Sequence, residues 1–110
     1  MGKLHLIPPH LARHSISPTE IVLPVELALE AIDLLEADGR RILGWEGWVL
    51  YPDGTHGHGG PQGWSFEPAS VDRHAAAARC RRSVAAEAAQ WIQDHPDASE
   101  RLHICITASE

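Results

Sequence analysis

The sequence predicts an α+β domain in which two main helices pack on one face of a small, mostly antiparallel or mixed sheet. Apolar residues recur at helical spacing after Pro24, and large residues alternate around Trp45 and again near the C-terminal end. The length of 110 residues suits one domain. Hydrophobic and charged fractions of 44% and 22% are ordinary for a globular chain, so the predicted core requires neither a metal nor a disulfide.

The first 22 residues are expected to form an extended arm that precedes a single domain over residues 23–110. Pro8, Pro9 and Pro18 remove backbone donors, and prolines keep such a segment at an edge or on the surface. A short strand at Lys3–Ile7 is expected within this arm.

The first long helix is predicted to begin at Pro24, a residue suited to the first helical turn, and to stop at Gly39. Its apolar stripe consists of Val25, Ala28, Leu29, Ile32 and Leu35. Glu26, Glu30 and Asp33 fall together on the opposite face. These acids indicate either a solvated helix face or an acidic docking surface, and both interpretations remain open.

Residues 40–51 are predicted to form a central strand, because both of its faces carry large apolar groups. One face carries Leu43, Trp45, Val49 and Tyr51, and the other carries Ile42, Glu46, Trp48 and Leu50. Gly44 and Gly47 interrupt the strand and indicate a bulge or a close approach by another backbone.

A turn is predicted at Pro52-Asp53-Gly54, followed by a glycine-rich loop or hairpin connection that leads to a short strand at Trp64–Glu67. Ser70 is expected to cap a second long helix that runs to about Asp94. The apolar stripe of that helix consists of Ala77, Cys80, Val84, Ala88 and Trp91. Residues 101–107 alternate as a last strand, with His103, Cys105 and Thr107 on the face opposite Leu102, Ile104 and Ile106.

The charge of the chain disfavours nucleic acid as a partner. Asp and Glu total 15 against 9 Lys and Arg, which gives a formal net charge of −6, and such a surface repels a phosphate backbone. A basic protein partner suits this charge better. Two widely separated cysteines and an N-terminal apolar run that prolines interrupt are typical of a reduced cytoplasmic protein, with neither a secretory signal nor a membrane span.

His56 and His58 are the residues that most resemble a metal site. Side chains two residues apart on an extended segment face the same side, so both imidazoles are placed to hold one ion. Zinc requires further ligands, and no other Cys or His stands at a recognised spacing. We therefore expect a solvated glycine loop without a cofactor, and keep a small metal-dependent enzyme that uses these histidines as the alternative.

Glu46 lies between Trp45 and Trp48 in a strand that otherwise requires apolar residues. A buried carboxylate without partners is costly, so this one should be paired, exposed or functional. Structural hydrogen bonding, partner recognition and catalysis all remain open for it, although no second acid or base accompanies it in the motif.

The run Trp45-Glu46-Gly47-Trp48, followed by Tyr51-Pro52-Asp53-Gly54, resembles a family of small bacterial proteins known as immunity protein 40, which are partners of polymorphic toxins. The similarity covers about residues 24–107. It implies an α+β inhibitor, not an enzyme, that binds a cognate toxin domain and blocks its active site. We therefore expect partner contacts from Trp45, Glu46, Trp48 and Tyr51, and from the acidic residues Glu26, Glu30 and Asp33.

Overall fold

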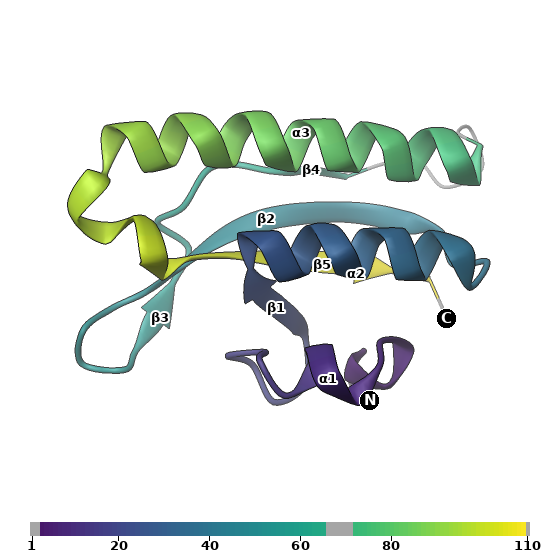
Figure 1. The fold of residues 1–110 in the computed structure, drawn as a ribbon, viewed down its shortest axis with the longest axis horizontal. Coiled ribbons are helices and arrows are strands. Elements are labelled where there is room, and N and C mark those ends of the chain that lie inside the picture. The colour runs from purple at the N-terminus through teal and green to yellow at the C-terminus, as the bar shows by residue number, and fades with distance from the viewer. Residues whose placement is uncertain (1–2, 66–71, 110) are drawn as a thin grey trace.

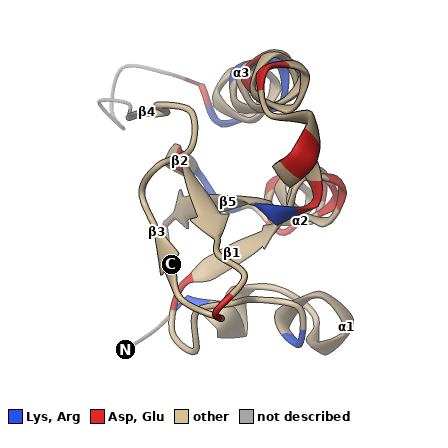
Figure 2. Ribbon diagram, turned by 90° about the vertical axis from the view of Figure 1, so that its left-hand side faces the viewer, with Lys and Arg blue, Asp and Glu red and all other residues tan. Residues whose placement is uncertain are grey.

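Two long helices lie against one side of an antiparallel sheet (Figures 1 and 2), as the sequence predicts. A computed structural model of the chain describes residues 3–65 and 72–109. Its strands are β1 (Ile21–Pro24), β2 (Ile42–Leu50), β3 (His56–Gly57), β4 (Trp64–Ser65) and β5 (Leu102–Ala108). Its helices are η1 (Leu4–Leu6), α1 (Pro9–Ala12), α2 (Val25–Ala37), α3 (Arg73–Asp94) and η3 (Pro96–Arg101).

The strands of the described residues form one sheet in the order β1-β5-β2-β3, with β4 also paired to β2. Every pairing is antiparallel. The C-terminal strand β5 therefore lies between β1 and β2, where it places Glu46 opposite Cys105 and Trp48 opposite His103. As predicted, β2 is a central strand, and its register with β5 is irregular between Ile42 and Gly44.

The hydrophobic core fills the space between the two long helices and the sheet. All five residues of the predicted stripe on α2 contribute to the core: Ala28, Ile32 and Leu35 are entirely buried, and Val25 and Leu29 are partly buried. Ala31 adds to them. The predicted stripe of α3, from Ala77 to Trp91, is buried throughout. Alternate sheet residues complete the core, including Leu23, Trp45, Val49, Ile104 and Ile106. Period-two alternation therefore separates these core-facing residues from those on the opposite face of the sheet.

Both long helices have defined ends. Pro24 is the N-cap of α2, and Gly39 follows its C-terminal end at φ +79°, where glycine is favoured. The side chain of Asp72 caps α3 by accepting hydrogen bonds from the N–H groups of His74 and Ala75. Asp72 therefore takes the role that we expected of Ser70, which lies outside the described residues.

The N-terminal segment differs from the expected extended arm. Lys3–Ile7 holds the short helix η1 instead of a strand, and α1 follows it. Leu6, Ile7 and Leu11 are buried in the main core. Burying these apolar side chains stabilises the fold, which an exposed arm would not do. Pro9 is compatible with a helix because it stands at the first position of α1.

Glu36 ties the two long helices together. Its carboxylate lies 2.8 Å from His74 Nδ1 and also contacts Arg81, which binds Asp33 at 2.6 Å. The hydrogen bond to His74, and then the hydrogen bond and charge of Arg81, hold the pKa of Glu36 below its ordinary value of 4.5. Because the pKa is lowered in the folded state, ionised Glu36 stabilises the fold at pH values above its ordinary pKa. This contribution is lost as the pH falls through the lowered pKa.

We expect Glu36→Gln to reduce the free energy of unfolding by about 0.5–1 kcal/mol near neutral pH, a modest loss because the ion pairs remain partly exposed. The difference between the variant and the unaltered protein should narrow as the pH falls below 4.5. Urea unfolding of both proteins over a pH series measures this difference. If the two free energies of unfolding differed by the same amount at every pH of the series, the lowered pKa of Glu36 would not contribute to stability.

Candidate functional site

The face of the sheet away from α2 and α3, here called the outer face, carries the residues of most chemical interest (Figure 2). Val22 and Cys105 are buried but lie outside the main core, which places them on this side. Strand alternation and register then assign its members, namely Val22, Glu46, Trp48, Leu50, His56, His103, Cys105 and Thr107.

Four side chains of this region form one contact group, the Trp48 cluster: Glu46, Trp48, His56 and His58. Trp48 Nε1 donates a hydrogen bond of 3.1 Å to Glu46 Oε1. The other carboxylate oxygen lies 3.5 Å from His58 Nδ1. The indole of Trp48 stacks on His56 at a centroid distance of 4.9 Å and meets the tilted ring of His58 at 4.8 Å.

The hairpin between β2 and β3 explains this grouping. Leu50 pairs with His56 and Val49 with Gly57, so both histidines project toward the side of Trp48. The predicted turn is present: Asp53 Oδ1 accepts hydrogen bonds from the N–H and hydroxyl of Thr55, and Gly54 has φ +90°. The predicted solvated loop is thus in part a paired strand whose imidazoles pack on Trp48.

Close backbone contacts hold the segment after β3 against β2. The N–H of Gly47 donates to the carbonyl of Pro61 at 3.0 Å, and a β-carbon at Gly47 would stand 2.5 Å from the ring of Pro61. A β-carbon at Gly63 would overlap the carbonyl oxygen of Trp45. The expectation that Gly47 marks a close approach by another backbone is therefore confirmed. The predicted strand is present as Trp64–Ser65, and its continuation to Glu67 lies outside the described residues.

The four motif residues expected at a partner surface separate into three places. Trp45 is 4% exposed in the core, where its Nε1 donates a hydrogen bond of 3.0 Å to Ser83 Oγ. Glu46 and Trp48 lie on the outer face. Tyr51 is 43% exposed and lies beside the glycines of the hairpin, on the side opposite Trp48 by strand alternation. The structure thus gives Trp45 a packing role and does not expose it for contact.

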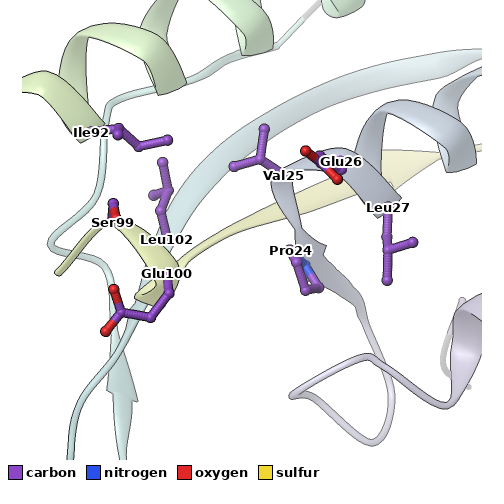
Figure 3. Close-up of a pocket in the computed structure, with 8 residues that line it drawn as sticks. All are labelled: Pro24, Val25, Glu26, Leu27, Ile92, Ser99, Glu100 and Leu102. Atoms are coloured by element: carbon purple, nitrogen blue, oxygen red, sulfur yellow. The ribbon is translucent and has the colours of Figure 1, made fainter. Parts of the chain in front are cut away.

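The acidic residues of α2 lie on the helix side of the sheet, away from the Trp48 cluster. Glu30 binds His10 at 3.0 Å, and Asp33 binds Arg81. Glu26 lines a shallow pocket of about 280 Å³ with Glu100 (Figure 3). Two of the three acids therefore hold elements of this chain together, and the structure does not bring any of them to Glu46.

Two residues of the outer face complete its chemistry. His103 is buried beside Trp48, and its Nδ1 donates to the carbonyl of Arg101 at 3.0 Å, since a carbonyl oxygen accepts only. Burial, and then the charges of Glu46 and Glu20, raise the pKa of the Cys105 thiol to about 12. This thiol therefore stays protonated and is a poor nucleophile. The alternation of residues 102–107 already indicated that both residues share the outer face.

The imidazole rings of His56 and His58 both pack against the indole of Trp48. Among residues 3–65 and 72–109, no three His, Cys, Asp or Glu side chains converge as metal ligands. His58 has Glu46 as a neighbour, and both imidazoles contact Trp48.

A scan of the described helices finds none with the length and apolar character needed to cross a bilayer. No protein-family model, curated protein or solved structure matches the chain.

Proposed function

We propose that this protein is an immunity-type protein of the bacterial cytoplasm that binds and neutralises a cognate toxin domain, without catalysis or a cofactor. The Trp48 cluster is the observation that carries the proposal. An indole and an exposed carboxylate stand together on the outer face, within the sequence motif that resembles the immunity family. Tryptophan is enriched among the residues that anchor protein interfaces.

The electrostatics of the chain support a basic toxin as the partner. A net charge of −6 accelerates the encounter with a positively charged protein, while aromatic anchors slow its dissociation. Glu46 and Trp48 combine the two properties at one place. The α2 acids Glu26, Glu30 and Asp33 lie apart from this cluster, so their contribution is to steering. Tyr51 also lies apart from the cluster.

Co-purification of a partner from the native host, followed by co-expression with the toxin domain that is captured, tests the proposal. We expect the protein to restore growth and to form a one-to-one complex by titration calorimetry. Trp48→Ala should weaken this complex by about thirtyfold or more, because a central aromatic anchor contributes roughly 2 kcal/mol or more. Asp94→Asn provides a control at an exposed residue of α3. A protein that neither binds the toxin domain nor restores growth would not be its immunity protein.

A further inference from the structure

Among the described strand residues of the outer face, Glu46 is the one that carries a fixed charge. The described strand residues on that face are otherwise apolar, hydroxyl-bearing, thiol-bearing or imidazole groups. The carboxylate is also close enough to the buried Cys105 to help Glu20 raise the pKa of that thiol, after the larger effect of burial. The carboxylates of Glu46 and Glu20 therefore make the surroundings of Cys105 negative.

The carboxylate of Glu46 is held in place but remains accessible. Trp48 Nε1 donates to one oxygen, and His58 Nδ1 lies near the other at a longer distance of 3.5 Å. The side chain is still 50% exposed. Each carboxylate oxygen has two lone pairs, so both keep acceptor capacity for an incoming donor. The site is therefore preorganised for a group with two parallel N–H donors.

We propose that Glu46 and the surrounding rings bind an arginine side chain of the partner protein. This inference rests on the proposed function, because the arginine belongs to the toxin domain. The guanidinium would pair with both oxygens of Glu46 and lie against the aromatic rings of the Trp48 cluster.

The rings favour a guanidinium over an ammonium group. A guanidinium is planar, weakly hydrated and able to stack on aromatic faces while it donates two parallel hydrogen bonds to a carboxylate. A lysine ammonium is a strongly hydrated point charge that matches one oxygen at a time. Trp48, His56 and His58 form a ring-lined rim beside a single carboxylate, and cation–π attraction is strongest at tryptophan.

N-acetyl-L-arginine amide is the probe that isolates this site, because it carries one guanidinium and no other charge. We expect it to shift the Trp48 indole N–H resonance saturably at millimolar concentrations, with the signal assigned through Trp48→Phe. The indole signals of the buried Trp45 and Trp91 should stay in place. N-acetyl-L-lysine amide should bind at least several-fold more weakly.

Glu46→Gln should abolish the saturable shift, whereas Glu87→Gln, the same chemical change at an exposed residue of α3, should leave it intact. Circular dichroism checks that each variant is folded. A non-saturable response, an equal response to the lysine amide, or binding that survives Glu46→Gln would overturn the assignment. Growth rescue is read independently, so a toxin neutralised without this site would overturn the arginine site and leave the immunity function standing.

Discussion

Replacing Trp45 with alanine is expected to lower the free energy of unfolding by about 3–5 kcal/mol, the usual loss for a large buried ring. The indole lies between the sheet and α3, where it is 4% exposed. Its removal leaves a cavity and deprives Ser83 Oγ of the hydrogen bond from Trp45 Nε1. Urea denaturation followed by far-ultraviolet circular dichroism measures the loss, since that signal comes mainly from the backbone.

Trp48→Ala is the matched control, because the same residue type stands three positions away on the other face of β2. Its partly buried ring should cost about 1–2 kcal/mol, in proportion to the smaller apolar area that it buries. The two variants should also separate in function, since we expect Trp48→Ala to weaken partner binding in a folded protein. Equal losses of stability would show that the two faces of β2 have been assigned wrongly.

The two tryptophans also show how far the sequence determines the fold. Alternation alone places Trp45 and Trp48 on opposite faces of the strand, and the structure confirms this. Both faces carry large apolar residues, so the pattern does not reveal which face the helices cover. That choice depends on how α2 and α3 pack across β5 and β2, which is a property of the whole core.

Strand β1 is not predicted from the sequence, because it has no local signal. Ile21–Pro24 is buried at its first three positions, so it has no alternation, and it runs directly into the N-cap of α2. Its strand character comes from pairing with β5 at the far end of the chain, for example Ile21 with Ile106. Tertiary pairing therefore decided a conformation that local propensity left open.

Of the Trp48 cluster, the sequence motif groups only Glu46 with Trp48. The sequence indicates His56 and His58 separately, as part of a glycine loop or hairpin connection or as a metal pair. The Pro52-Asp53-Gly54 turn contained the missing signal, because a tight turn after a strand returns the chain along that strand. The register Leu50–His56 then brings both imidazoles to Trp48.

Gly63→Ala is expected to detach the edge segment from β2 and to lower the free energy of unfolding by about 1–3 kcal/mol, the usual cost of forcing extra atoms into a packed contact. The added β-carbon would overlap the carbonyl oxygen of Trp45, and backbone atoms cannot move aside as a flexible side chain does. Separation also removes the hydrogen bond from Gly47 N–H to Pro61. Amide hydrogen exchange at Gly47 should therefore accelerate at least about tenfold, because this amide becomes accessible to water.

Gly59→Ala controls for the general effect of adding a methyl group to this glycine-rich segment. A β-carbon there would stand 3.2 Å from the hydroxyl of Tyr51, which lies at the end of an exposed side chain and is able to move. We expect a change within about 0.5 kcal/mol and unaltered exchange at Gly47, as for most surface substitutions. Similar exchange at Gly47 in both variants would show that the backbone contact at Gly63 does not hold the segment. Faster exchange at Gly47 in Gly63→Ala alone would show instead that the absence of a side chain at position 63 allows this edge to lie beside the Trp48 cluster.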